Sequence, residues 1–227
     1  MMNPWQLSID PLRSEARELE KSLVTDLSCG LSSTEAQERL KEYGPNQLVE
    51  KKGPSAFSIF LGQFNNFIIW VLLGAAIISG FLTEWLDALA IIAIVIMNAI
   101  LGFIQEFRAE KAIAQLKKLS APGAKVIRDG ELKLIPAKEL VPGDLIQIEA
   151  GDHIPADARL ISIAYFQTQE ASLTGESTPV EKSTEILPLG DIPLADRKNM
   201  VYLGTSAVSG KAKAFVTGTG MNTELGK

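Results

Sequence analysis

The chain reads FSIFLGQFNNFIIWVLLGAAIISGFL over residues 57–82 and WLDALAIIAIVIMNAILGFIQEF over residues 85–107. As helices these stretches would be about 39 Å and about 34 Å long, and each is long enough to cross the hydrocarbon core of a bilayer. Only Thr83 and Glu84 separate them. The sequence therefore predicts a transmembrane hairpin of two helices.

Basic residues flank the two stretches and indicate their orientation. No lysine or arginine occurs in residues 53–107. Lysine and arginine close to membrane helices stay on the cytoplasmic side. We therefore expect an integral, multi-pass protein of the cell membrane with both termini in the cytoplasm, and a second helix that continues as a cytoplasmic stalk. The flanking basic residues are Lys51, Lys52, Arg108, Lys111, Lys117 and Lys118.

The alternative interpretation of the two stretches is a pair of buried helices in a soluble protein. A chain of 227 residues is too short to surround both with other core residues, so we favour the membrane. Asn65, Asn66 and Asn98 are the polar residues deep in the stretches. Such residues hydrogen-bond a neighbouring helix or line a pathway, and the sequence leaves both roles open.

The composition excludes several classes of protein. A formal net charge of −5 excludes a strongly basic nucleic-acid-binding protein, and a hydrophobic content of 46% excludes a disordered tail. Cys29 is the only cysteine and His153 the only histidine, which rules out a disulfide scaffold and falls short of a zinc-ligand set. Neither a Walker A loop nor a dinucleotide fingerprint is present. We expect no metal site and no cofactor-binding residues here.

Residues 1–52 are predicted to form a small helical segment. Asp10-Pro11 is typical of a helix start, because proline is favoured at the first helical position. Residues 32–35, Ser-Ser-Thr-Glu, form a capping box for a second helix, which ends at Gly44. The segment has too few apolar residues for a core of its own. We therefore expect it to dock on the larger cytoplasmic part.

Beyond the stalk, apolar residues recur with a period of two, which predicts β-strands. Asp129-Gly130 is typical of the tight turn of a β-hairpin. Short strands without a long helix between them favour a compact sandwich or barrel. The expected fold class is α+β: a transmembrane helical hairpin plus a cytoplasmic β-rich domain and short N-terminal helices. The predicted strands cover residues 125–128, 131–135, 145–149, 158–164, 166–170, 200–203 and 211–217.

The most distinctive motif is Leu173-Thr174-Gly175-Glu176-Ser177, which follows the strand predicted at residues 166–170. Alone, a Thr-Gly-Glu-Ser turn is weak evidence, because glycine and serine are common in ordinary loops. Two motifs precede it: Val-Pro-Gly-Asp at residues 141–144 and Gly-Asp-His-Ile-Pro-Ala-Asp at residues 151–157. With the helical pair before all three, the chain resembles the N-terminal part of a P-type cation-transporting ATPase of the calcium-pump-like subfamily.

The resemblance covers nearly the whole chain. Residues 98–106, NAILGFIQE, and 109–112, AEKA, belong to a region that looks like the first two membrane helices of these pumps. Residues 43–46, YGPN, are similar to the end of the N-terminal cation-ATPase domain, and residues 219–227, TGMNTELGK, to the end of the actuator domain.

The resemblance implies three parts. They are an N-terminal cation-ATPase segment over residues 1–52, the transmembrane hairpin over residues 53–107, and a stalk helix with a distorted jelly-roll-like actuator domain over residues 108–227. It also implies that the actuator rotates toward a phosphorylation domain and dephosphorylates an aspartyl phosphate there.

The resemblance also assigns roles in this dephosphorylation. In-line attack of water on an acyl phosphate needs a positioned base or acceptor and a loop that can approach a crowded anionic centre. Glu176 is expected to supply the carboxylate, and Gly175 to remove a side chain that would clash. Thr174 and Ser177 are expected to hydrogen-bond the phosphate region and to hold the loop.

The phosphorylated Asp-Lys-Thr-Gly motif of the family does not occur in this sequence. We therefore expect the chain to be the front portion of a pump that cannot hydrolyse ATP alone. ATP and Mg²⁺ are implied for the complete pump. The expected partners are its phosphorylation and nucleotide domains, its later membrane helices, the lipid bilayer and the transported cation, with no nucleic acid.

Two questions stay open. Animal calcium pumps carry acidic residues near the positions of Asn65 and Asn66, so Na⁺, K⁺, H⁺, Mg²⁺ and Mn²⁺ remain alternatives to Ca²⁺. A non-catalytic, membrane-anchored regulatory module is the alternative to an enzyme, because the phosphorylation motif is missing.

Overall fold

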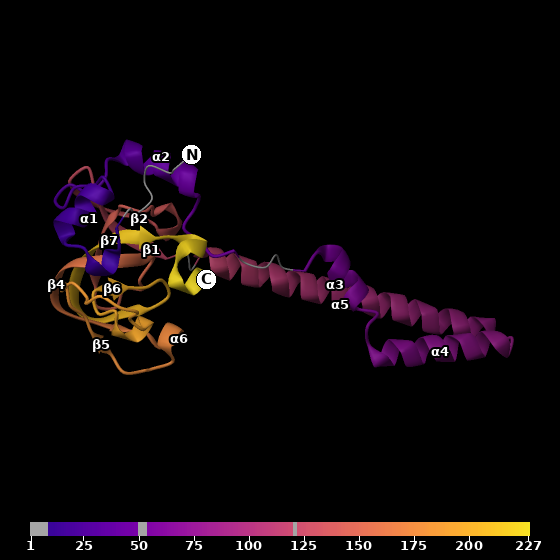
Figure 1. The fold of residues 1–227 in the computed structure, drawn as a ribbon. Helices are drawn as coiled ribbons and strands as arrows, with labels where there is room; N and C mark the ends of the chain where they lie inside the picture. Colours follow the sequence, from indigo (N-terminus) through magenta and orange to yellow (C-terminus); the bar gives the residue numbers. More distant parts are fainter. Residues whose placement is uncertain (1–8, 50–53, 120–121) are drawn as a thin grey trace. The chain divides into compact units, whose positions relative to one another are not determined.

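The computed structural model describes residues 9–49, 54–119 and 122–227, without the side chains of residues 114–119. The described residues form two compact units, the first from within residues 1–49 and 121–227 and the second from within residues 50–120 (Figure 1). Lys51 and Lys52, which contribute to the expected orientation, lie outside the described residues.

The first helix of the first unit begins later than the sequence predicts. Asp10 does cap a turn, since its carboxylate accepts a 3.0 Å hydrogen bond from the N–H of Leu12, but this 3₁₀ turn covers only Pro11–Arg13. Helix α1 (Ala16–Ser22) starts afresh behind Glu15. Glu15 is therefore the N-cap residue that the Asp10-Pro11 pattern did not predict, and its N–H donates a 3.1 Å hydrogen bond to the Glu18 carboxylate.

The second helix, α2 (Ser33–Tyr43), confirms its prediction. The side chain of Ser32 accepts a hydrogen bond from the N–H of Glu35, and the helix ends at Gly44, whose φ is +76°. Glycine reaches this left-handed region without a steric penalty.

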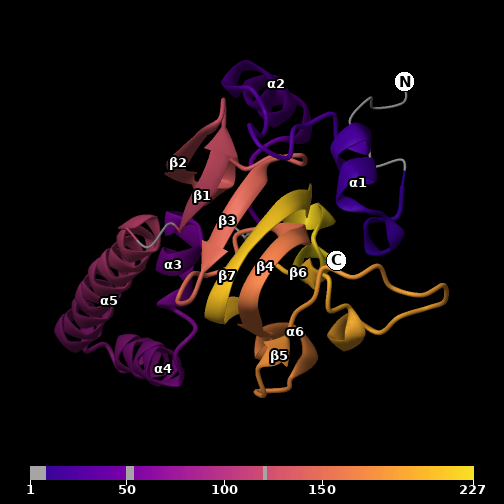
Figure 2. The same cartoon turned by 90° about the vertical axis from the view of Figure 1, so that its left-hand side faces the viewer.

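The strands of the first unit form one antiparallel sheet in the described residues, in the order β2-β1-β3-β7-β4-β5, with β6 also paired to β4 (Figure 2). The mixed helix and sheet class is confirmed. The Asp129-Gly130 turn between β1 and β2 is confirmed too, with φ values of +55° and +77°. The strands are β1 (Gly123–Arg128), β2 (Glu131–Pro136), β3 (Leu145–Glu149), β4 (Asp157–Gln169), β5 (Val180–Glu181), β6 (Met200–Val201) and β7 (Ser206–Gly218).

Strand β4 corrects the prediction of two strands at residues 158–164 and 166–170. The backbone of Tyr165 takes φ +51°, and the pairing with β7 shifts in register between Ala164 and Gln167. A β-bulge of this kind bends a strand without ending it. The sheet also contains β5, and β7 starts five residues before its predicted start at Lys211; neither feature was predicted.

The N-terminal helices pack on this sheet, as expected. Leu19 of α1 and Leu23, which follows its last residue, are fully buried against Ile127, Leu145 and Phe215. Helix α2 contributes Ala36 to a separate small cluster with Leu31 and Val141. The larger core cluster lies among the strands and includes Val126, Ile148, Leu160, Phe166 and Val216.

The second unit contains α3 (Ala56–Gly62), α4 (Phe67–Phe81) and α5 (Trp85–Leu119). The sequence predicts one continuous helix over residues 57–82, and this is wrong: α3 and α4 are bent by 63° at a break. Asn66 lies in the break, and its side chain accepts a 3.0 Å hydrogen bond from the N–H of Ile68, which caps α4. A capping asparagine favours a new helix start over a continuous one.

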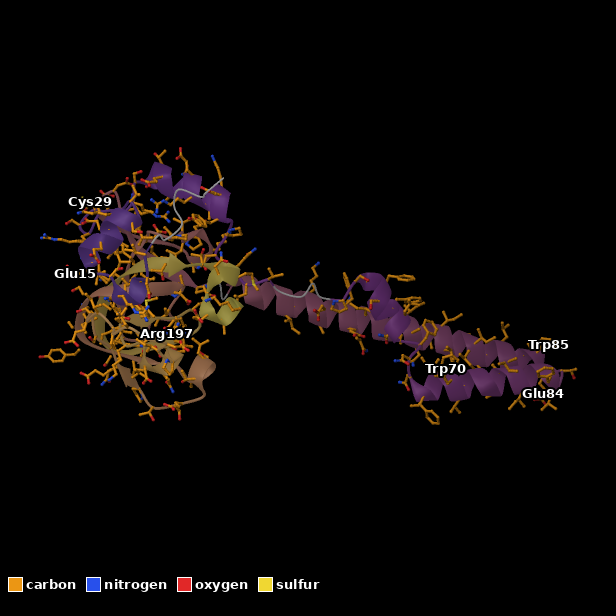
Figure 3. The ribbon with its side chains drawn as sticks, viewed as in Figure 1. Glu15, Cys29, Trp70, Glu84, Trp85 and Arg197 are labelled. Carbon is orange, nitrogen blue, oxygen red and sulfur yellow. The ribbon has the colours of Figure 1, made fainter. Side chains whose placement is uncertain are left out.

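Both shorter helices contact α5. At the end of α3, Gln63 donates 2.7 Å and 3.2 Å hydrogen bonds to the Glu106 carboxylate and to the carbonyl oxygen of Ile59. At the far end of the unit, Glu84 and Trp85 lie where α4 turns into α5 (Figure 3). Asn98 is exposed on α5.

In the described part of the chain, one helix is long and apolar enough to cross a membrane, over Trp85–Ile113, and the bent pair α3 and α4 adds a second candidate if it counts as one span. Helix α5 runs without interruption past Phe107, so the expected helical continuation of the second stretch is confirmed.

Candidate functional site

A short helix follows strand β4 and leads into the four predicted site residues, here called the TGES loop. They are Thr174, Gly175, Glu176 and Ser177. This helix, α6, covers Ala171–Thr174, and it lies with β5 at the end of the first unit opposite α2 (Figures 1 and 2). The sequence predicted strand up to Glu170 and no helix here.

Gly175 ends α6 in the left-handed conformation, with φ +77°, and its N–H donates to the carbonyl oxygen of Ala171 at 3.0 Å. A Cβ at this position would meet no atom within 4 Å. Within the described residues, glycine is favoured at position 175 because of its left-handed backbone, not because a side chain would lack space. The expected clash would involve the phosphate-bearing partner, which lies outside these residues.

Thr174 holds the loop from within. Its Oγ1 donates to the carbonyl oxygen of Glu170 at 3.1 Å and accepts from the N–H of Glu176 at 3.3 Å. The main-chain oxygen of Ser177 accepts a 3.4 Å hydrogen bond from the side chain of Gln169. These contacts fold residues 174–177 back on the end of β4.

Glu176 itself is exposed. Within the described residues its carboxylate forms no hydrogen bond or ion pair, and the residues on both sides of it are exposed as well. The loop therefore presents a free carboxylate on a turn whose backbone is fixed.

A buried ion pair lies at the base of the loop, and the sequence did not predict it. The side chains of Glu170 and Lys182 are both completely buried and in direct contact. Thr168 donates a 2.9 Å hydrogen bond to Glu170 Oε1, and Lys182 Nζ lies 5.8 Å from the ring centroid of Tyr202. Burial lowers the pKa of Lys182, and the charge of Glu170 opposes this shift.

The period-two pattern could have revealed this pair. Phe166 and Thr168 of β4 and Glu170, the residue directly after this strand, alternate along the chain, and all three are buried. A charged residue in the inward series of a strand needs a partner of opposite charge. The nearest lysine after the loop is Lys182.

The motif at residues 141–144 stabilises the turn before β3. The buried carboxylate of Asp144 accepts hydrogen bonds from Arg128 Nε at 2.8 Å and from the N–H of Val141 at 2.9 Å. From α2, Arg39 donates to the carbonyl oxygen of Pro142 at 2.8 Å.

The motif at residues 151–157 connects to the C-terminal segment. The Asp157 carboxylate accepts from the N–H groups of Leu203 and Glu224 at 2.8 Å and 2.7 Å, and burial raises the pKa of Asp157 to about 6. Asn46 donates to the carbonyl oxygen of Pro155 at 2.8 Å and accepts from the N–H of Gly220 at 2.8 Å. The side chains of Asn46 and Asp157 therefore connect the motif at residues 151–157 with the C-terminal segment.

No group of three or more His, Cys, Asp or Glu residues in the described parts of the chain is arranged to hold a metal ion.

Comparison with known proteins gives two matching family models. The model of the P-type ATPase actuator domain matches residues 118–227, and that of the cation transporter/ATPase N-terminus matches residues 13–79.

Three relatives show how far the similarity extends. The chain is 46% identical over 210 residues to the calcium-transporting ATPase of Bacillus subtilis, which is 92% of this chain and 24% of that protein. It is 44% identical over 212 residues to the probable cation-transporting ATPase F of Mycobacterium tuberculosis, covering 93% and 23%. It is 40% identical over 215 residues to the sodium/potassium exporting P-type ATPase of Schizosaccharomyces pombe, covering 94% and 21%. The chain thus spans about a quarter of the length of these relatives.

Proposed function

Because the chain belongs to the P-type cation-transporting ATPases and carries their N-terminal segment and actuator domain, we propose that it is the actuator-bearing N-terminal part of an ATP-driven cation pump. In this pump the TGES loop promotes hydrolysis of an aspartyl phosphate. The partners of the loop are the phosphorylation and nucleotide domains, which also bind ATP and Mg²⁺.

The observation that supports this role most directly is the exposed carboxylate of Glu176 on a fixed turn. Hydrolysis of an acyl phosphate needs a water molecule that is oriented for in-line attack and a group that accepts its proton. The Glu176 carboxylate has no partner in the described part of the chain, so it can orient such a water molecule. Its position at the surface lets it reach a phosphate on another domain.

The other loop residues have different roles in this proposal. Thr174 fixes the turn through the main chain of Glu170 and Glu176. Gly175 allows the left-handed turn and, without a side chain, a close approach to the phosphate. Ser177 is exposed next to Glu176, so its hydroxyl can donate to a phosphate oxygen.

The pump acts in a membrane, and we propose that the second unit anchors this chain as a two-span hairpin. The bent pair α3 and α4 forms the first span and α5 the second. The absence of lysine and arginine from residues 53–107 and the basic flanks support a multi-pass topology with both termini in the cytoplasm.

We propose Ca²⁺ as the transported ion. The name of the Bacillus subtilis relative supports this choice, whereas that of the Schizosaccharomyces pombe relative favours Na⁺ or K⁺. ATPase activity of the longer pump that contains this chain, measured at constant Mg²⁺–ATP with Ca²⁺, Na⁺, K⁺, Mn²⁺ or additional Mg²⁺ supplied in turn, and across pH for H⁺, separates these ions. Stimulation by another ion but not by Ca²⁺ would overturn the assignment.

The proposed role of the loop is tested with Glu176→Gln in the longer pump. The amide cannot accept a proton, so phosphoenzyme should form from ATP and then decay about 10²- to 10⁴-fold more slowly, as followed by an ATP chase of labelled enzyme. Glu181→Gln is the matched control, because Glu181 is also exposed and lies in β5, shortly after the loop. Decay at the normal rate in Glu176→Gln would remove this residue from the mechanism.

A further inference from the structure

Two backbone links and one side-chain pair close the TGES loop at its base. Strand β5 pairs with β4 through Thr168 opposite Val180, and the N–H of Lys182 donates to the carbonyl oxygen of Phe166 at 3.0 Å. Next to these links, Glu170 and Lys182 form the buried ion pair. The residues between them, 171–181, include the whole TGES loop.

Glu170 connects this pair to the loop through its main chain. Its carbonyl oxygen accepts from the N–H of Leu173 at 2.9 Å and from the N–H and Oγ1 of Thr174 at 3.0 Å and 3.1 Å. Thr174 Oγ1 in turn accepts from the N–H of Glu176. A continuous series of contacts therefore runs from Lys182 through Glu170 and Thr174 to Glu176.

The ion pair is a weak source of stability. Both side chains are removed from water, and the loss of hydration roughly offsets the attraction between buried opposite charges. Glu170 Oε2 is buried without a hydrogen-bond partner in the described residues, which adds to the free-energy cost of burying the pair. The main effect of the pair is to fix positions, because the Glu170 carboxylate and the Lys182 ammonium group hold each other in place.

We propose that Glu170 and Lys182 are positioning residues, which hold the TGES loop so that Glu176 meets the phosphate in the correct geometry. Neither side chain can touch the phosphate, since both are fully buried. The inference rests on the proposed function of the loop. It adds that the buried pair of Glu170 and Lys182 sets the position of Glu176.

The test separates position from stability with the double variant Glu170→Gln/Lys182→Met. A single variant leaves one charge buried and unpaired, whereas the double variant removes both and keeps similar side-chain volumes. Amide hydrogen exchange on the chain in detergent should show Leu173, Thr174 and Gly175 exchanging at least about tenfold faster, while the β3 and β7 amides stay protected. Lys211→Met, which removes a mostly exposed lysine paired with Glu149, is the control that should leave the loop unchanged.

In the longer pump, the double variant should form phosphoenzyme normally and lose it about 10- to 100-fold more slowly, because a misplacement of about 1 Å has effects of this size. Should the double variant not fold, Thr168→Val removes only the hydroxyl that donates to Glu170 and should slow decay by a smaller factor.

Normal decay in both variants, with slow decay in Glu176→Gln, would show that the pair is only structural and would overturn the inference alone. Normal decay in Glu176→Gln would overturn the proposed function and this inference with it.

Discussion

The buried guanidinium of Arg39 donates a 2.8 Å hydrogen bond to the carbonyl oxygen of Pro142. It also donates to the carbonyl oxygen of Val24 at 3.0 Å and contacts the Glu35 carboxylate. One side chain of α2 thereby joins the N-terminal segment to the turn before β3.

Replacing this guanidinium should release α2. Arg39→Met leaves the carbonyl oxygens of Pro142 and Val24 without their donor, so we expect the opening free energy of α2 to fall by about 3 kcal/mol. Amide hydrogen exchange over Ser33–Tyr43 measures this change. Arg17→Met, at an exposed position of α1, should have no such effect. Unchanged protection of α2 in Arg39→Met would contradict the prediction.

Asp157 should make stability depend on pH. Burial raises its pKa from 3.8 to about 6, so the folded chain binds this proton more tightly than the unfolded chain. The stabilising contribution is complete below about pH 4 and is lost as the pH rises through about 6. Asp157→Asn cannot titrate, so the difference in unfolding free energy between the variant and wild type should change by up to about 3 kcal/mol across this window.

Exchange of the β4 and β7 amides between pH 4 and 7 reports this difference. Asp191→Asn, at an exposed loop carboxylate, should leave the pH profile as in wild type. A difference between Asp157→Asn and wild type that does not vary with pH would argue against a raised pKa.

Two glycines with similar backbone angles should respond differently to alanine. Gly175 (φ +77°) has free space around it, so Gly175→Ala should cost only the strain of a left-handed residue, about 1 to 2 kcal/mol. At Gly210 (φ +75°) a Cβ would lie 2.2 Å from the carbonyl oxygen of Ala164, and Gly210→Ala should cost clearly more. Thermal unfolding of both variants gives the order, and Gly175→Asn should recover part of the loss. Equal losses of stability in Gly175→Ala and Gly210→Ala would show that the space around the two glycines does not decide the cost of the substitution.

Asn66 should set the start of α4. Asn66→Ala removes the acceptor for the N–H of Ile68 and should weaken the first turn of α4 by about 1 kcal/mol, whereas Asn66→Asp should retain the cap. Amide exchange at the start of α4 in lipid nanodiscs measures the effect. The control is Asn65→Ala, because the Asn65 side chain has no hydrogen bond in the described residues. A larger effect at residue 65 would contradict the assignment.

Local patterns predicted the parts of the fold that local chemistry decides. Asp129-Gly130 adopts the two positive φ values of a tight hairpin, and Ser32 caps α2, as their sequences indicate. Strand β3 has its predicted ends, because polar turns bound a short apolar run on both sides.

The remaining features depend on contacts that no local pattern contains. The sequence around Tyr165 suggests a boundary between two strands. In the structure β4 stays paired with β7 on both sides of Tyr165, which lies in a β-bulge. Apolar content alone suggested a continuous helix over residues 57–82, whereas the capping bond of Asn66 divides it.

The candidate site shows the same limit. The motif located the four residues of the TGES loop, but not the buried pair of Glu170 and Lys182 beneath it. The two members of this pair come together only when β5 returns to β4.

The bridge between Leu31 and Arg128, together with the packing of Leu19 and Leu23 on Ile127 and Phe215, has a consequence for biosynthesis. The N-terminal segment is translated before the two apolar stretches, but most of its packing partners are translated after them. At about 5 to 20 residues per second, the roughly hundred residues between Leu31 and Arg128 take about 5 to 20 s to make. During that interval α1 and α2 have no sheet to cover, so they are made before the two apolar stretches but can pack only after both stretches have been translated.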